Sequence, residues 1–87
     1  MTTISGDGTA TSCPANSTSP TLSVPVNIPN GAIILDIRTW VTGASSGKAS
    51  QRAGGITYTG GNITFEVYNN DSRARSWTPH ATVVYVA

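Results

Sequence analysis

Charged residues are scarce in this sequence: they make up 10% of its 87 residues, and the formal net charge is +1. A typical soluble domain carries about 25% charged residues. Nucleic-acid binding needs clustered Lys and Arg, and the five basic residues here are spread from Arg38 to Arg75, so we expect no nucleic-acid partner. Because a surface with few charges does little to prevent association, the composition favours an oligomer or a larger assembly. The alternative is a soluble chain whose surface is rich in hydroxyl groups.

Cysteine and histidine occur only once each, as Cys13 and His80. One thiol cannot form a disulfide within the chain, and a single Cys with a single His cannot build a structural zinc site. Nucleophilic catalysis needs a nucleophile, a base and an orienting group, and His80 is the single histidine that could serve as the base. We expect His80 instead to be a hydrogen-bonded edge residue at the start of a strand. The four carboxylates, Asp7, Asp36, Glu66 and Asp71, are dispersed along the chain. The segments Gly6–Gly8 and Asn69–Asp71 are interpreted as turns rather than as calcium sites. We therefore predict no catalytic residue, no metal and no cofactor, and hence no enzyme.

Long apolar runs are also missing. No run approaches the ~20 residues that span a bilayer, so we expect no membrane segment. The segment Met1–Gly6 lacks the basic start and the apolar stretch of a signal peptide, which predicts a protein made and kept in a cytoplasm.

The strongest structural signal is the segment Ile56–Val67, in which two alternating runs flank Gly60 and Gly61. Glycine adopts positive φ without a Cβ penalty, so the pair predicts a β-hairpin turn with Thr59 opposite Asn62. This register places all large apolar side chains on one face, and a slip by one residue would scatter them. The predicted buried face consists of Ile56, Tyr58, Ile63, Phe65 and Val67.

Three further strands are indicated by alternation. Leu22–Ile28 contains Pro25 and precedes Pro29, which predicts an edge strand because proline cannot donate to a ladder. Ala32–Val41 is the longest apolar run and is predicted as a mostly buried central strand. The last strand is predicted over His80–Val86, with alternate residues facing opposite sides.

The two faces of the predicted central strand differ in character. One face carries Ile33, Leu35, Ile37, Thr39 and Val41; the other carries Ile34, Asp36, Arg38 and Trp40. On the second face, either a partner covers the apolar side chains or the Arg38 guanidinium lies over the Trp40 indole.

Two segments have no strong pattern. Residues 1–20 are polar and are read either as an extended N-terminal arm or as a short edge strand around Thr9–Cys13. Thr42–Gly54 is rich in Gly, Ala and Ser and is read as a long loop, either an interaction loop or an inert excursion. The whole chain is predicted to be one all-β domain, a small antiparallel β-sandwich or jelly-roll-like barrel of five to seven strands without helices.

One turn region combines aromatic rings, amides and guanidinium groups, which serve both protein contacts and sugar binding. The candidate contact residues are Tyr68, Asn70, Asp71, Arg73, Arg75 and Trp77. A core position for Trp77, at the end of the sandwich, is the alternative to a contact role.

A chain with its own Met, a surface rich in Ser, Thr and Gly, a polar N-terminal segment, and a strand-like ending at Ala81–Ala87 resembles small virion proteins of tailed bacteriophages. Capsid decoration or cement proteins and fibre-tip modules are of this type. The resemblance implies a non-enzymatic virion protein that forms trimers on the capsid and binds the major capsid protein or other virion proteins, with the arm reaching neighbouring subunits. The alternative is a carbohydrate- or receptor-binding module of a tail fibre, or a small lectin, in which Trp77 and Tyr68 stack on a surface glycan.

Overall fold

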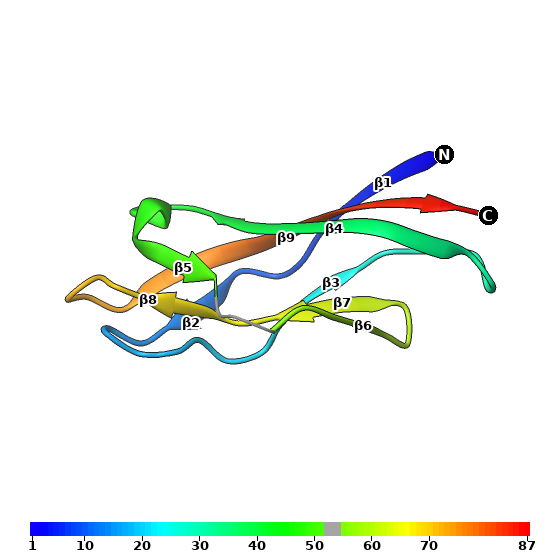
Figure 1. Ribbon diagram of the computed structural model, residues 1–87. Coiled ribbons are helices and arrows are strands. Elements are labelled where there is room, and N and C mark those ends of the chain that lie inside the picture. The colour runs from blue at the N-terminus through cyan, green and yellow to red at the C-terminus, as the bar shows by residue number, and fades with distance from the viewer. Residues whose placement is uncertain (52–54) are drawn as a thin grey trace.

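The computed structural model describes residues 1–51 and 55–87, which form nine β-strands and one short 3-10 helix (Figure 1). The strands are β1 (Thr2–Asp7), β2 (Thr11–Cys13), β3 (Leu22–Pro25), β4 (Ile33–Thr42), β5 (Ala49–Gln51), β6 (Thr57–Thr59), β7 (Asn62–Phe65), β8 (Val67–Asn69) and β9 (Arg75–Val86), and the helix is η1 (Ser46–Lys48). The predicted all-β class is confirmed, in the form of several antiparallel sheets that do not close into a barrel. Nine strands exceed the predicted five to seven because four of them are three residues long. Over the described ranges, no helix is long and apolar enough to cross a membrane.

The twelve-residue strand β9 is the centre of the larger sheet. Strand β4 pairs antiparallel with β9 on one side, and β1 and then β2 pair with it on the other. The side chains of β9 that face the core are Trp77, Pro79, Ala81, Val83 and Tyr85. The predicted alternation along the last strand is therefore confirmed, although this strand begins five residues earlier than predicted.

The second layer consists of the sheet β3-β7-β6 and the small sheet β5-β8. The hairpin register is confirmed, with Thr59 paired to Asn62, and Gly60 and Gly61 have φ values of 60° and 82°. Ile63 and Phe65 are buried, whereas Ile56 precedes β6 and is 37% exposed, so it does not belong to the buried face as predicted.

The N-terminal residues are part of the sheet, and the prediction of an extended arm over residues 1–20 is wrong. Strand β1 pairs with β9 from Thr2 to Asp7, and the alternative of a short edge strand is confirmed as β2. Gly6 and Gly8 explain this placement. A Cβ on Gly6 would lie 2.6 Å from the Pro25 carbonyl oxygen, and a Cβ on Gly8 would overlap the Ser23 carbonyl oxygen. The segment Gly6–Gly8, predicted as a turn, is instead a backbone packed directly on β3.

Strand β4 differs from its prediction in two ways. Within the described ranges it pairs only with β9, so it is an edge strand and not a buried central strand. A register irregularity between Ile34 and Asp36 leaves Leu35 without a partner in β9, and alternation is therefore interrupted there. Ile33 and Leu35 are 64% and 53% exposed as a result, while Ile34 packs against the core.

The predicted long loop over residues 42–54 contains ordered elements in its described part. The helix η1 follows β4, and β5 then pairs with β8 through Ala49 opposite Asn69. Residues 52–54 lie outside the described residues, so the prediction of an interaction loop is not addressed there.

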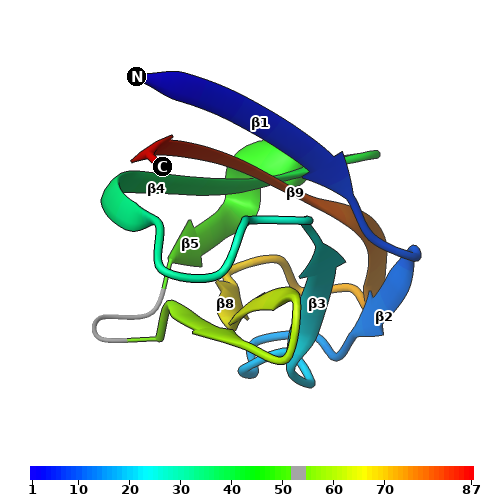
Figure 2. The same ribbon diagram turned by 90° about the vertical axis from the view of Figure 1, so that its right-hand side faces the viewer.

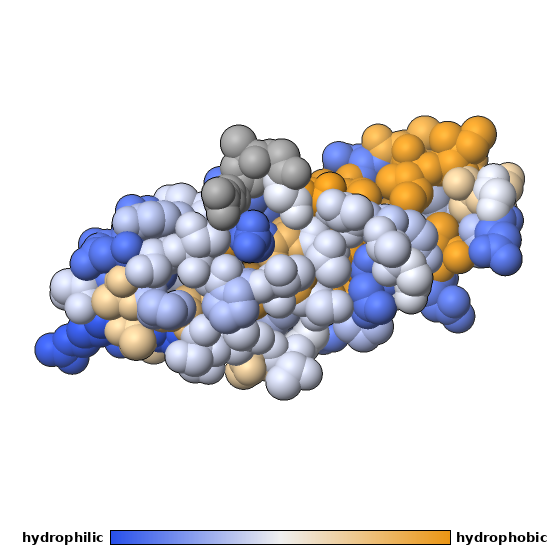
Figure 3. All heavy atoms as spheres, turned by 90° about the horizontal axis from the view of Figure 1, so that it is seen from below, coloured by the Kyte–Doolittle hydropathy of each residue, from blue (hydrophilic) through white to orange (hydrophobic). Residues whose placement is uncertain are grey.

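The two sides of the sandwich differ. The end view in Figure 2 shows the end of β1 beside β2 and β3 on one side, where the glycine contacts lie, and β4 on the opposite side. Among the described residues, β4 and β6 are each the last strand of their sheet. Ile33, Leu35 and Ile56 are the exposed aliphatic residues of these two edges. The space-filling view in Figure 3 shows apolar side chains gathered at the end of the molecule where both termini lie. The β4 and β6 edges therefore present apolar surface to solvent.

Candidate functional site

The predicted contact region around Asn69–Arg75 is a tightly bonded turn. Asn69 is fully buried, and its Nδ2 donates to the carbonyl oxygens of Cys13 at 3.1 Å and Arg73 at 3.0 Å. Its Oδ1 accepts the backbone N–H of Asp71 at 2.9 Å. This amide therefore ties the turn to β2, and its role is structural.

Asp71 and Arg75 bind each other within this turn. The Arg75 Nε donates to Asp71 Oδ2 at 2.9 Å, and the Arg73 backbone N–H donates to Oδ1 at 3.3 Å. The hydrogen bond from Arg75, aided by the backbone N–H groups, lowers the pKa of the Asp71 carboxyl. Because the two side chains satisfy each other, they offer less to a ligand than their sequence positions indicate.

Three other candidates remain at the surface. Tyr68 is 37% exposed and donates its hydroxyl to the Asn16 carbonyl oxygen at 2.9 Å. Asn70 donates Nδ2 to Ser50 Oγ at 2.7 Å, and Arg73 is exposed. These side chains lie at one end of the molecule beside the Asp71 and Arg75 pair.

Trp77 is not available for contact, which corrects the prediction that it stacks on a partner or a sugar. Its side chain has no exposed surface, and its Nε1 donates to the Ala44 carbonyl oxygen at 2.8 Å. It faces inward because β9 alternates from this position, so the core role considered as the alternative is the observed one.

A second group of polar and aromatic residues lies on the outer face of the larger sheet. His80 lies in the middle of β9 rather than at an edge, and its ring contacts side chains of the two neighbouring strands, β1 and β4. Its Nδ1 is 2.5 Å from Asp7 Oδ1, and its Nε2 is 2.6 Å from Thr42 Oγ1. A carboxylate accepts, so in the neutral imidazole the proton lies on Nδ1 and Nε2 accepts from the Thr42 hydroxyl. The ring is thereby fixed at both nitrogens.

Trp40 packs beside this hydrogen-bonded ring. The Trp40 and His80 rings are stacked, with centroids 5.5 Å apart and planes inclined by 21°. Trp40 is 44% exposed, and with Arg38 and Thr82 it lines a shallow depression of about 240 Å³. The ring that stacks on Trp40 is His80, the residue opposite it in the ladder, while Arg38, one of the two alternatives considered for covering this face, lines the depression beside the indole.

The outer face has the order of groups that acyl-transfer enzymes use, namely a hydroxyl, an imidazole and a carboxylate. Here the three groups lie on the surface of a sheet, and the Asp7 side chain is 74% exposed. Enzymes of that kind also aim donors at the developing oxyanion inside a cleft that excludes water. On this face the arrangement holds the imidazole in one orientation under Trp40.

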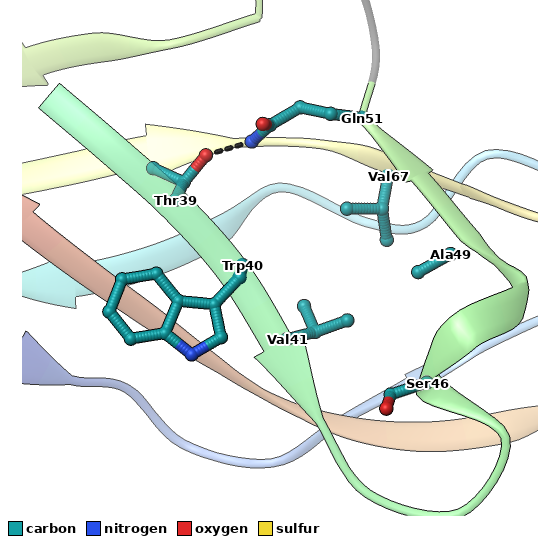
Figure 4. Close-up of a pocket in the computed structure, with 7 residues that line it drawn as sticks. All are labelled: Thr39, Trp40, Val41, Ser46, Ala49, Gln51 and Val67. Atoms are coloured by element: carbon teal, nitrogen blue, oxygen red, sulfur yellow. Dashed lines mark hydrogen bonds between the residues drawn. The ribbon is translucent and has the colours of Figure 1, made fainter.

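A second hollow lies on the other side of β4, between that strand and β5 (Figure 4). It measures about 220 Å³ and is lined by Thr39, Trp40, Val41, Ser46, Ala49, Gln51 and Val67. In Figure 4 the Trp40 ring points away from Val41, Ala49 and Val67, and Gln51 donates a hydrogen bond to Thr39. This hollow is therefore a gap between β4 and β5 that the Gln51 side chain spans.

No group of three metal-binding side chains occurs within residues 1–51 and 55–87. The outer-face group escaped sequence reasoning because Asp7, Thr42 and His80 are far apart in the chain. The available signal was the alternation Gly6, Asp7, Gly8, which places two glycines on one face and a carboxylate on the other.

No family model, curated protein or solved structure matches this chain.

Proposed function

We propose that this chain is a non-enzymatic structural protein of a tailed-phage virion, a capsid decoration protein that binds the shell through the outer face of its larger sheet. The observation that carries the proposal is the clamped aromatic surface formed by Trp40, His80, Asp7 and Thr42. The composition supports it: a polar, nearly uncharged chain gains by burying its surface in an assembly. The virion location belongs to the same proposal, as does a trimer that forms on the capsid lattice; the association of free chains in solution is a separate property.

The hydrogen-bonded His80 ring favours binding because Trp40, which stacks on it, loses less conformational freedom when a partner covers it. Trp and Arg are enriched among residues that dominate interface energies, and here Trp40 and Arg38 lie side by side on an exposed face. The His80 ring is bonded at both nitrogens, so the indole that stacks on it is partly immobilised before binding. Under this proposal the hydroxyl, imidazole and carboxylate position Trp40 and perform no chemistry.

The test is co-sedimentation of the purified chain with capsids that lack it, prepared from the phage whose genome carries this reading frame. We expect saturable binding, and we expect Trp40→Ala to weaken it by roughly tenfold to a hundredfold, as for a central aromatic anchor. Tyr68→Ala is the matched control, because Tyr68 is also a partly exposed aromatic residue but lies in β8. Absence of binding by the unmodified chain, or equal binding by Trp40→Ala, would refute the proposal.

Carbohydrate binding by a fibre-tip module is the second candidate, and the exposed Trp40 indole beside the depression favours it. An aromatic plate with neighbouring donors such as Arg38 and Thr82 suits a pyranose ring. This replaces the pair of Trp77 and Tyr68, since Trp77 is buried. A glycan array probed with the unmodified chain and with Trp40→Ala separates the two functions: a decoration protein binds no glycan, whereas a sugar-binding module loses its glycan signal in the variant.

A further inference from the structure

The first half of β4 is an unpaired sheet edge. Within residues 1–51 and 55–87, β4 pairs only with β9, so its other edge has backbone groups available for a further strand. Ile33 and Leu35 are strongly exposed there. At Thr39 a side chain of β5 meets the strand, because Gln51 donates a hydrogen bond to the Thr39 hydroxyl. Among the described residues, the unpaired edge before this contact therefore runs from Ile33 to Arg38.

Two opposite charges lie close together on this edge. Asp36 and Arg38 are both exposed and project from the same face of β4, with the half-buried Ile37 between them. Neither forms an ion pair with another described residue. An unpaired acid and an unpaired base at positions i and i+2 form a pattern that becomes complementary to itself when the strand direction is reversed.

We propose that the β4 edge pairs antiparallel with the β4 edge of a second copy of this chain, about a two-fold axis at Ile37. In that register Ile37 faces its own counterpart, and Asp36 of each copy faces Arg38 of the other. Residues directly opposite in an antiparallel pair share a face and lie within reach of each other, so two ion pairs form across the axis. This is the antiparallel register that brings both charges on the strand opposite a charge of the other sign.

The surrounding structure is compatible with this register. The regular part of the ladder runs over Asp36, Ile37 and Arg38, because the register irregularity lies before Asp36 and the Thr39 side chain is bonded to Gln51. It joins the two larger sheets into one. An isologous contact of this kind closes at two copies, whereas pairing with a different edge would continue into a filament. The interface is small, so we expect a dimer that dissociates on dilution.

Charge reversal and charge exchange test the pairing. The mass of the purified chain is measured by sedimentation velocity over a dilution series, and a thermal melt confirms that each variant is folded. We expect the unmodified chain to approach twice the monomer mass at high concentration. Asp36→Arg or Arg38→Asp alone places like charges opposite each other at both symmetric positions, and should weaken dimerisation about tenfold or more. The double variant with both changes restores opposite charges and should recover dimerisation.

Lys48→Glu is the matched control, because it reverses an exposed charge in η1, away from this edge, and should leave the mass unchanged. The proposal is overturned by a monomer at every concentration, by a threefold mass, or by a double variant that stays as weak as the single ones. If the chain is a monomer, Asp36 and Arg38 serve only to prevent this sheet edge from pairing with other strands. The inference does not depend on capsid binding, since Trp40→Ala tests that function separately and leaves Asp36 and Ile37 in place.

Discussion

Gly8→Ala should destabilise the fold strongly, because the glycine lies where two backbones meet. An added Cβ would lie 2.7 Å from Pro79 Cγ and would overlap the Ser23 carbonyl oxygen, which belongs to the backbone of β3. A backbone atom cannot move aside as a flexible side chain can, so the segment after β1 must shift away from β3. The shift also strains the hydrogen bond from the Gly8 N–H to the Pro79 carbonyl oxygen, which measures 2.8 Å. Overpacking of this kind costs about 2 to 4 kcal/mol.

The assay is chemical denaturation of Gly8→Ala beside Gly47→Ala. Gly47 lies in η1 with no atom within 4 Å of its Cβ position and without a positive φ, so alanine there should be neutral or stabilising by up to about 1 kcal/mol. For a domain of this size, a loss of about 2 to 4 kcal/mol lowers the melting temperature by roughly 10 to 25 °C. If the two variants unfold at the same denaturant concentration, the close packing of the N-terminal segment on β3 is wrong.

Two further variants test the turn that follows β8. Asp71→Asn should reduce acid sensitivity: Arg75 lowers the pKa of the Asp71 carboxyl in the folded state, so this carboxylate contributes stability above the ordinary aspartate pKa, near about 4, and loses it as pH falls through the lower folded value. The free energy of unfolding should therefore fall less steeply below about pH 4 in the variant than in the unmodified chain; equal slopes would show that the ion pair contributes nothing. Asn69→Ala should cost about 2 to 4 kcal/mol by urea denaturation, because it leaves the buried Cys13 carbonyl oxygen without its donor, and a loss below about 0.5 kcal/mol would contradict a structural role.

Local signals predicted the hairpin and the last strand correctly. The Gly60 and Gly61 pair specifies both the turn and its register, because glycine at positive φ and the alternation of apolar residues select the same pairing. Pro25 similarly predicted that β3 lies at an edge, where a missing N–H costs no ladder bond. These features depend on neighbours in the sequence, so a single sequence is sufficient to find them.

The faces of β4 and the position of the N-terminal residues depend on contacts between distant segments, and sequence reasoning failed there. Strict alternation placed Ile33 and Leu35 on the buried face, but the irregularity before Asp36 exposes both. Residues 1–20 contain a single large aliphatic residue, Ile4, and this composition favours an arm as much as a short edge strand. Residues 2–7 instead belong to the sheet. They form β1 because β9 offers a free edge and because small residues allow a close approach to β3.

The outer-face group depends on the same long-range contacts, and it couples stability to the proposed binding surface. Gly6 and Gly8 pack their backbone on β3, while Asp7 between them projects to the opposite face and accepts from His80. An alanine at position 8 that pushes this segment away from β3 should also displace the Asp7 carboxylate. The His80 ring would then lose its hydrogen bond to Asp7 and keep the one to Thr42. Trp40 stacks on that ring, so a change on the inner face of β1 should loosen an indole on the outer face of β4. The β1 segment therefore acts as a positioning element for Trp40 as well as an edge of the sheet.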